Sequence, residues 1–424
     1  MNTWLNFNDS IITLTAPAHI TSETRRLLSG RAYVSRRNGS LPTDPPADVP
    51  LIATALRHLR DQATSQFVAR GEMAEAVAVA LAAAEHVFVY GPPGTAKSSL
   101  LRCFASGIGG KFFRILLNPD ITREDLVGPL DPEAIQRGEW RRKWSKFATC
   151  DLALLDEVWK ASPQVSNMLL DGLEERLVTD GDDDRPIPLI SAIAASNKVP
   201  EDKAMQAAYD RFLVRLSVGY VRDPDDFRSV LIANAGSQII PPALTTDDIR
   251  LLAATAEAMS FNPPPDMIEK LTEMWQAIGP GQLSDRRWKK TLKLAMAYAL
   301  LCDETPSARH LGVGRWTLWT EPDEETDVRN LVLSLTDPMG GDVLDCEALL
   351  ADLKAKAQTL AGMKLQERAE VAGKARKLIT RVQKTQSSAD AKPYAVRLNA
   401  IVHEANAVVS QVLDLMAGVP AGAS

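Results

Sequence analysis

The segment GPPGTAKS (91–98) lies between the apolar run VFVY (87–90) and a stretch with helical periodicity. A short apolar run that ends at a glycine turn is typical of a buried strand. Glycines allow backbone N–H groups to close around a phosphate chain at the start of a helix. The segment therefore predicts a phosphate-binding loop over 91–99, although a glycine turn that merely links a strand to a helix is the competing interpretation.

Within this loop, Lys97 would neutralise charge on the β- and γ-phosphates of a nucleotide, and the hydroxyl of Ser98 would ligate Mg²⁺. Residue 96 is alanine where such loops commonly have their last glycine. Its methyl group is a small intrusion, so we expect binding to survive. The predicted ATP/ADP contacts are Gly91, Pro92, Pro93, Gly94, Thr95, Ala96, Lys97, Ser98 and Ser99.

A second apolar run, Leu152 to Leu155, is followed at once by Asp156 and Glu157. Strands of doubly wound sheets present their ligands at the carboxyl edge. We expect Asp156 to hold the Mg²⁺ shell and Glu157 to orient or deprotonate the attacking water. An apolar run followed by two acids often marks only a strand end, but a phosphate loop about sixty residues upstream strengthens the prediction.

Two further residues fit an ATPase. Asn197 follows the apolar segment ISAIAAS and could position the lytic water; a solvent-exposed loop asparagine is the alternative. Arg211 precedes another apolar run and could reach the γ-phosphate of an adjacent subunit, where a guanidinium would stabilise transition-state charge. The alternative for Arg211 is a surface salt bridge, for example with Asp210.

Short apolar runs at 87–90, 112–117, 152–155, 189–195 and 212–221 alternate with helical or polar connections. This alternation predicts an α/β fold with a parallel sheet and covering helices. We expect an N-terminal extension with a proline-rich linker over 1–50, the nucleotide-binding α/β domain over 51–222, a helical lid over 223–345 and a C-terminal helical hairpin over 346–424.

Composition excludes several classes of function. The 424 residues carry a formal net charge of -6, which argues against strong attraction to nucleic-acid phosphates. The four cysteines form no CxxC pair, so a zinc site and a disulfide framework are not expected. No signal peptide or membrane-spanning stretch is recognisable, and we expect a cytoplasmic protein with reduced thiols.

Several stretches between about Ser65 and Asp327 resemble the MoxR-type AAA+ ATPases, and within them the regulatory ATPase variant A (RavA) branch. They are GPPGTAKS, ITREDLVGPL, LLDEVWKA, AASN, AYDRFLVRL and SDRRWKK. Alanine before the loop lysine is usual in this family. The resemblance implies a P-loop AAA+ module of the α/β class, with a five-stranded parallel sheet in the order 5-1-4-3-2, a helical lid and a homo-oligomer, a hexamer.

The resemblance also implies roles for single residues. Asn197 corresponds to the sensor 1 position, Arg211 to the arginine finger and Arg286 to sensor 2 in the lid. Arg287 is the rival of Arg286, with a salt bridge that packs the lid as the alternative. Insertions are implied at Leu126–Trp144, facing the centre of the ring, and at Leu177–Leu189, a hairpin with the acidic turn DGDDD.

The predicted function is an ATP-driven, chaperone-like remodeller of a protein partner. The resemblance suggests a partner with a von Willebrand factor A (vWA) domain. The RavA branch has a β-rich insertion in its C-terminal stalk, and no such stretch is recognisable between Leu349 and Ala417. A nucleic-acid motor is the alternative, against which the acidic charge balance and the acidic hairpin weigh. A non-hydrolysing scaffold would have no need of Glu157.

Overall fold

The computed structural model describes residues 48–180, 183–200, 206, 208–232, 243–357, 360, 365–387 and 394–416, with the backbone of 3–7 and 10–13. The chain divides into two compact units, Met1–Val328 and Arg329–Ser424, which are described separately. The expected boundary at 345/346 falls inside helix α14 (Pro338–Ala357). The C-terminal unit therefore begins earlier than the sequence suggested.

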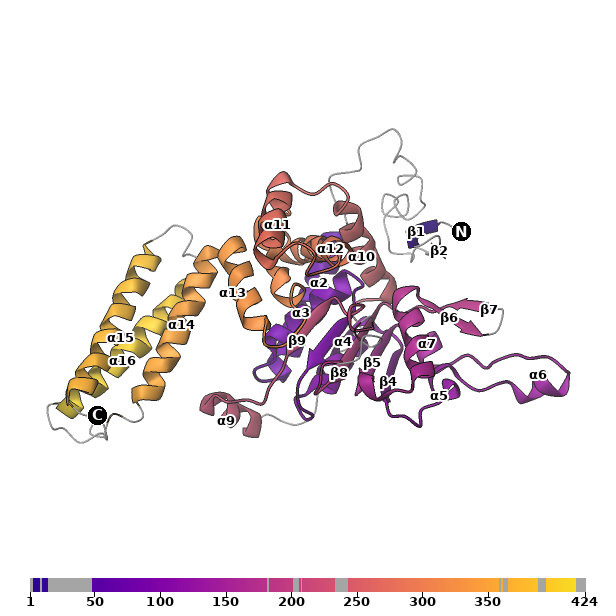
Figure 1. Cartoon of the computed structure of the whole chain (residues 1–424), viewed down its shortest axis with the longest axis horizontal. Coiled ribbons are helices and arrows are strands. Elements are labelled where there is room, and N and C mark those ends of the chain that lie inside the picture. Colours follow the sequence, from indigo (N-terminus) through magenta and orange to yellow (C-terminus); the bar gives the residue numbers. More distant parts are fainter. Residues whose placement is uncertain are drawn as a thin grey trace. The chain divides into compact units, whose positions relative to one another are not determined.

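A five-stranded parallel sheet forms the centre of the first unit (Figure 1). Its strands are β3 (Val87–Tyr90), β4 (Phe112–Leu116), β5 (Leu152–Asp156), β8 (Ser191–Ser196) and β9 (Val214–Ser217). The spatial order is β4-β5-β8-β3-β9. Counted along the chain from the β9 side this is 5-1-4-3-2, the order implied by the resemblance. All four strand pairings are parallel.

Apolar side chains cover both faces of the sheet. On one face Phe88, Leu155 and Ala194 join a buried cluster with helix α7 (Pro163–Glu174) and the short helix α5 (Arg123–Val127). The one-turn helices η2 (Lys146–Thr149) and η3 (Val158–Lys160) complete that layer. Helices α2 (Val49–Gln66), α3 (Gly71–Ala82) and α4 (Lys97–Ile108) pack together, and α3 and α4 contact the sheet. The inner strands β5 and β8 are therefore buried from both sides, as their continuous apolar runs require, whereas the edge strand β4 is only partly buried.

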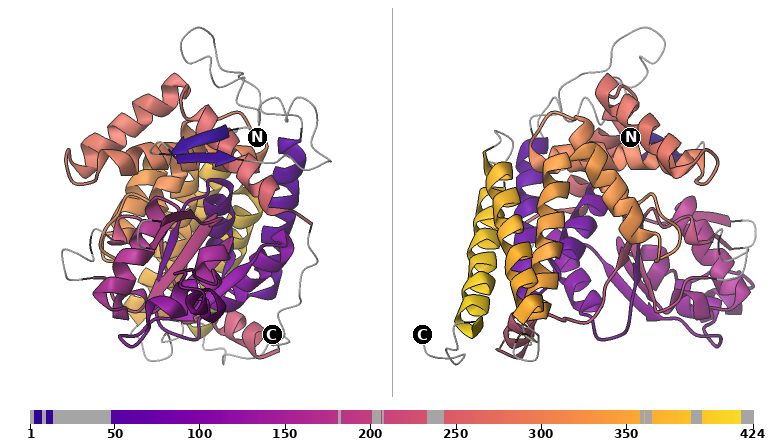
Figure 2. Two further views of the ribbon diagram at one scale, coloured as in Figure 1. Left: turned by 90° about the vertical axis from the view of Figure 1, so that its right-hand side faces the viewer. Right: turned by 60° about the vertical axis from the view of Figure 1, so that its left-hand side comes forward.

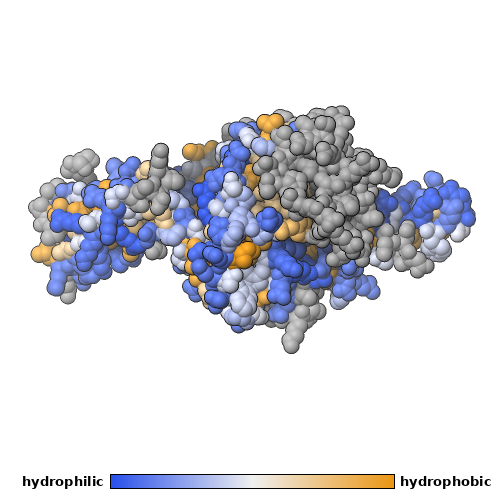
Figure 3. Space-filling model, turned by 90° about the horizontal axis from the view of Figure 1, so that it is seen from above, coloured by the Kyte–Doolittle hydropathy of each residue, from blue (hydrophilic) through white to orange (hydrophobic). Residues whose placement is uncertain are grey.

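Two insertions project from the sheet layer (Figure 1). The segment Leu126–Trp144 forms a two-stranded arm in which Leu130 pairs with Arg142, and the short helix α6 (Pro132–Gln136) lies at its far end. The arm's projecting end is mostly hydrophilic in Figure 3. The second insertion is a hairpin of β6 (Leu177–Asp180) and β7 (Asp183–Pro186). Both insertions lie where they were expected.

Helices follow the last strand of the sheet. They are α9 (Pro224–Ile232), α10 (Thr246–Met259), α11 (Pro265–Ile278), α12 (Asp285–Cys302), η4 (Ala308–Trp316) and α13 (Glu325–Thr336). Helices α10 and α12 pack against α2 and α3, which join this helical region to the sheet. α13 spans the division between the two units. The helical region expected to form a lid is thus attached to the layer that carries the sheet through α10 and α12.

The second unit corrects the expected helical hairpin. Helix α14 packs against both α15 (Leu365–Gln386) and α16 (Ala395–Met416), so the bundle has three helices in its described part (Figure 2). The region expected to form a hairpin, 346–424, contains the end of α14 together with α15 and α16. Buried residues at seven-residue spacing, such as Val343 and Leu350, supply the α14 side of the core. A third apolar face closes a core that two helices would leave open.

At the N-terminus, β1 (Thr3–Phe7) and β2 (Ser10–Thr13) pair in antiparallel fashion, where no element was predicted. Most of the predicted linker, 37–50, lies outside the described residues, and α2 begins at Val49. None of the helices in the described ranges has the length and apolar character needed to cross a membrane.

Candidate functional site

The carboxyl edge of the sheet brings together the loop, the acid pair and the asparagine. Tyr90 is paired with Ser196, and Asp156 with Ala195, so β3, β8 and β5 end side by side. The N–H of Gly91 donates to the Ser196 carbonyl over 3.0 Å, which fixes the start of the loop to the strand that Asn197 follows. Asn197 is exposed at this edge. Parallel topology thus assembles the segments that the sequence singled out.

The loop is shaped to surround an anion. A Cβ built on Gly94, where φ is +81°, would meet no atom within 4 Å, so open space adjoins the loop backbone there. The α4 N-cap, Ala96, provides no side-chain cap, which leaves the first N–H groups of a twelve-residue helix available. Backbone donors beside open space are suited to phosphate oxygens.

Lys97 lies within this loop and is 8% exposed. Its Nζ donates to the carbonyls of Gly91 (2.9 Å) and Pro92 (3.1 Å). Burial lowers the pKa of Lys97, and the negative charges of Asp156 and Glu157 act in the opposite direction. The ammonium and both carboxylates therefore share one electrostatic site, and a phosphate could replace the carbonyls as the lysine's acceptor.

Ala96 adopts a left-handed backbone, with φ at +65° and ψ at +12°. This is the conformation that favours glycine, which explains why glycine is common at this loop position. The expectation that the alanine methyl group is a small intrusion considered only the space that the methyl group occupies. The larger consequence of alanine here is backbone strain.

The acid pair has the environment of a cation site. Asp156 is half-buried, and its Oδ2 lies 3.6 Å from a guanidinium nitrogen of Arg114 on β4. Glu157 has a left-handed φ of +55°. Its Oε2 is buried without a hydrogen-bond partner among the described residues, although Lys160 Nζ lies 3.4 Å away. Together with the part-buried hydroxyl of Ser98, these carboxylate oxygens are ligands of the kind that Mg²⁺ prefers.

A cavity of about 290 Å³ adjoins the loop. Val218, which lines this cavity, lies against Gly91 of the loop. A Cβ built on Gly91 would lie only 2.1 Å from the Val218 carbonyl oxygen, so the edge of the cavity is beside the loop. Its lining includes residues that precede α3 and the segment after β9. The residues are Ala69, Arg70, Glu72, Met73, Leu216, Ser217, Val218, Gly219, Tyr220, Val221, Arg222 and Asp226.

Arg70 joins this cavity to the loop. Its guanidinium donates to the Thr95 carbonyl over 2.9 Å and to the Gly219 carbonyl over 3.0 Å. Sequence reasoning missed Arg70 because nothing nearby resembles a motif. The one available signal was its place just before a helix, α3, that leads directly into β3.

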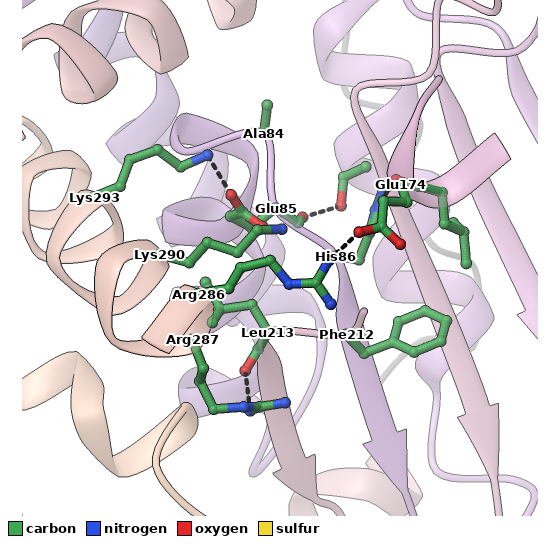
Figure 4. A network of polar contacts seen from close by, with 12 residues as sticks. Ala84, Glu85, His86, Glu174, Phe212, Leu213, Arg286, Arg287, Lys290 and Lys293 are labelled. Carbon is green, nitrogen blue, oxygen red and sulfur yellow. Dashed lines mark hydrogen bonds and ion pairs between the residues drawn. The ribbon is translucent and has the colours of Figure 1, made fainter. Parts of the chain in front are cut away.

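The two arginines, Arg211 and Arg286, lie at the other edge. Arg211 precedes β9 and forms an ion pair of 2.8 Å with Glu174 at the end of α7. Arg286, in the first turn of α12, pairs with the other oxygen of the same carboxylate (Figure 4). The strand β3 with its flanking residues, His86 to Gly91, separates this amino edge from the loop by roughly 16 Å at about 3.3 Å per residue. Arg286, which the resemblance assigned to sensor 2, therefore lies at the edge opposite the loop of its own chain.

Arg287, the alternative to Arg286 for the sensor 2 position, is buried, and its contacts join α12 to neighbouring segments of the same chain. Its guanidinium donates to Asp210 Oδ1 (2.7 Å) and to the Thr317 carbonyl (2.8 Å). Burial alone would raise the pKa of Asp210, but the charges of Arg287 and neighbouring arginines outweigh it and lower the pKa. The alternative weighed for Arg287, a salt bridge that packs the lid, describes these contacts. Asp210 pairs with Arg287 and also lies 3.5 Å from Arg286, whereas Arg211 pairs with Glu174.

Comparison with known proteins decides the family. A sequence model described as the MoxR domain in MoxR-vWA-beta-propeller ternary systems matches residues 54–253. An uncharacterised protein of Methanocaldococcus jannaschii is 31% identical over 301 residues, which cover 70% of this chain and 80% of the relative. The chaperone MoxR1 of Mycobacterium tuberculosis is 29% identical over 174 residues, 39% of this chain and 44% of that protein. The chain belongs to the MoxR-type AAA+ ATPases.

The fold of this MoxR-type protein also has a counterpart among solved structures. A proposed ATPase from Cytophaga hutchinsonii superposes with a TM-score of 0.52 at 19% sequence identity, covering 68% of this chain and 89% of that one. At this identity the likeness concerns the fold alone.

Proposed function

We propose that this MoxR-type chain binds ATP with Mg²⁺ and hydrolyses it to ADP and phosphate. The observation that carries the proposal is that β3, β5 and β8 end side by side, which brings Lys97, Asp156 and Glu157 to one edge beside an open, uncapped helix N-terminus. Lys97 and the loop N–H groups would hold the phosphates, and Glu157 would act on the attacking water. Asn197 would help to orient that water. The nucleoside would occupy the nearby cavity, and Arg70, which lines that cavity, is hydrogen-bonded to the loop.

Magnesium would be held by Ser98 and Asp156, and when bound it neutralises the charge that develops on the phosphate oxygens.

Two substitutions separate binding from turnover. Lys97→Ala removes the main counter-charge in the loop, so we expect nucleotide binding to fall below detection in a fluorescent-nucleotide titration. Glu157→Gln keeps the shape but not the carboxylate, so binding should persist while steady-state phosphate release is lost. Equal ATP turnover in the wild type and in Glu157→Gln would remove Glu157 from the mechanism.

We further propose that the active site is shared between subunits of a ring, a hexamer. The support is the position of Arg211 at the edge opposite its own loop, from which a neighbour's γ-phosphate is the plausible target. An arginine supplied in trans accelerates such reactions by about 10³-fold or more. Arg211→Ala should therefore bind ATP and hydrolyse it poorly. Light scattering with and without ATP measures the oligomer directly.

The proposed partner is a protein with a vWA domain, and the proposed work is chaperone-like remodelling. Support comes from the matched family, described as part of MoxR-vWA-beta-propeller systems, and from the name of the M. tuberculosis relative. We retain the RavA branch as a proposed placement, on the shared motifs and the helical C-terminal unit. Glu157→Gln in ATP should trap the partner for mass spectrometry. Salt-sensitive retention of DNA with no captured protein would favour the nucleic-acid motor instead.

A further inference from the structure

Glu174 joins two residues that the sequence assigned to separate roles. Its Oε2 contacts the Arg211 guanidinium at 2.8 Å, and its Oε1 contacts the Arg286 guanidinium. Arg211 stands on the approach to β9, while Arg286 belongs to the lid helix α12. One carboxylate therefore fixes the finger arginine and the lid arginine relative to each other.

The position of Glu174 is itself well fixed. It is the last residue of α7, and Arg176 just beyond it is anchored to the amino edge of the sheet. The Arg176 guanidinium donates to the carbonyls of Leu173 (3.0 Å), Ala84 (2.9 Å) and Ile190 (3.1 Å). The carboxylate thus projects from a rigid base rather than from a loop, as Figure 4 shows for its contact with Arg286.

The positive charges of Arg211 and Arg286 lie close together and need a negatively charged group such as the Glu174 carboxylate between them. Two guanidinium groups that meet on one carboxylate carry one net positive charge in place of two, so their mutual repulsion is reduced. Each oxygen engages one arginine, and Asp210 Oδ2 lies 3.5 Å from the second terminal nitrogen of Arg286, so carboxylates hold both guanidiniums in one place. A phosphate carries oxygens of the right charge and spacing for such a pair.

We propose that Glu174 is a positioning residue that aligns Arg211 and Arg286 as one unit for the nucleotide of the neighbouring subunit. This inference rests on the proposed ATP hydrolysis at shared sites. It assigns Arg286 to the neighbour's nucleotide together with Arg211. Glu174 touches neither the phosphates nor water in this scheme and acts only through the two arginines.

A purely structural role for Glu174 makes a different prediction. The side chains of Glu174, Arg211 and Arg286 are 27%, 22% and 46% exposed, and ion pairs at that exposure contribute little to stability. A merely structural pair would therefore leave both the melting temperature and the turnover almost unchanged. A positioning residue would leave the melting temperature unchanged and lower the turnover.

The test begins with Glu174→Gln, which keeps the shape of the side chain. We expect kcat to fall by roughly 10²-fold, as for a misplaced catalytic group, while the KM for ATP changes little because the loop lies at the other edge. The melting temperature should change by no more than about 2 °C. Glu175→Gln, at the exposed neighbouring position, is the matched control and should behave as the wild type.

Combination with Arg211→Ala makes the test specific. If Glu174 acts only through the arginines, the double variant Glu174→Gln/Arg211→Ala loses little beyond Arg211→Ala alone. Mixed with Lys97→Ala under subunit exchange, Glu174→Gln should regain activity, because some interfaces then pair an intact loop with intact arginines. Mixed with Arg211→Ala it should regain none. If Glu174→Gln does not fold, Arg286→Ala, at an exposed side chain, must show the same two mixing results.

The outcomes separate the two proposals. A wild type without ATP turnover contradicts the proposed function and this inference with it. An active wild type in which Arg211→Ala is impaired, but Glu174→Gln has normal kcat, overturns the inference alone. Losses that multiply in the double variant, or recovery when Glu174→Gln is mixed with Arg211→Ala, also overturn it.

Discussion

The buried charge of Glu85 offers a sharp test of how the lid is attached. Glu85 is 3% exposed between α3 and β3. Lys290 of α12 donates to its Oε2 over 2.8 Å, and Lys293 pairs with its Oε1 (Figure 4). Lys293 is itself 7% exposed at its side chain. The lid helix is therefore joined to the sheet layer through a buried ion-pair network.

Glu85→Gln removes the charge and leaves the two ammonium groups facing an amide. Breaking one side of a buried pair costs about 3–5 kcal/mol, because the remaining charge stays desolvated without compensation. Lys290 is partly exposed and can turn toward water, so we expect the lower end, about 3 kcal/mol. For a domain of this size that corresponds to a fall of roughly 5 to 10 °C in melting temperature.

Tryptophan fluorescence is the assay, because all eight tryptophans lie in the first unit, between Trp4 and Trp319. The signal therefore follows this unit in a chain whose two units need not unfold together. Urea titrations of the wild type and Glu85→Gln give the difference in unfolding free energy. The matched control is Glu273→Gln on α11, whose pair with Lys270 is solvent-exposed and should matter by less than about 1 kcal/mol.

The pH dependence supplies the second half of the test. Burial alone raises the pKa of Glu85, but Lys290 and Lys293 outweigh it and hold the pKa well below its usual value. A depressed carboxyl pKa contributes stability above the unfolded value of about 4.3, and the contribution is lost as pH falls. The difference in unfolding free energy between the wild type and Glu85→Gln should therefore become smaller below about pH 4.3. A difference in unfolding free energy of less than about 1 kcal/mol at pH 7, or a difference that grows in acid, would refute a stabilising role for the buried ion pairs of Glu85.

Three further predictions concern single residues. Ala96→Gly relieves a left-handed strain of about 1–2 kcal/mol against a loss of about 0.4–1 kcal/mol through the unfolded chain, so urea unfolding should show a slight gain in stability. Arg70→Ala frees the Thr95 carbonyl and should raise the dissociation constant for ATP by about tenfold in a titration. Burial raises the pKa of Cys150 to about 12, so iodoacetamide should label it at pH 8 only after urea unfolds the protein, as peptide mass spectrometry would detect.

The parts of this protein that the sequence predicted well are those specified by local pattern. Each strand expected from an apolar run is present, because a strand covered on both faces needs such a run. The parallel arrangement then brings the ends of β3, β5 and β8 together at one edge, where sheets of this kind bind their ligands. The last strand, expected over 212–221, is shorter, because Phe212 and Leu213 pack into the core before the strand begins.

The features that the sequence did not predict depend on contacts between distant residues. Glu174 and Arg286 are separated by 112 positions, and no spacing or motif relates them. The cavity and Arg70 likewise depend on how the segment before α3 meets the segment after β9. The packing of the last helix in the C-terminal unit could have been predicted, because Leu398, Ala405 and Val412 recur every seven residues in the sequence and form one buried face.

The strand topology itself makes a self-sufficient active site difficult for this chain. The loop, the acids and Asn197 follow strands and so lie at the carboxyl edge, whereas Arg211 precedes a strand and lies at the amino edge. α7 runs back from the carboxyl edge and delivers Glu174 to the amino edge, and α12 begins beside it with Arg286. The separation is set by the length of the strands, which a rotamer change cannot shorten. If the two arginines serve catalysis, as proposed, a second copy of the chain must supply them, because the edge at which each residue lies is set by its place before or after its strand.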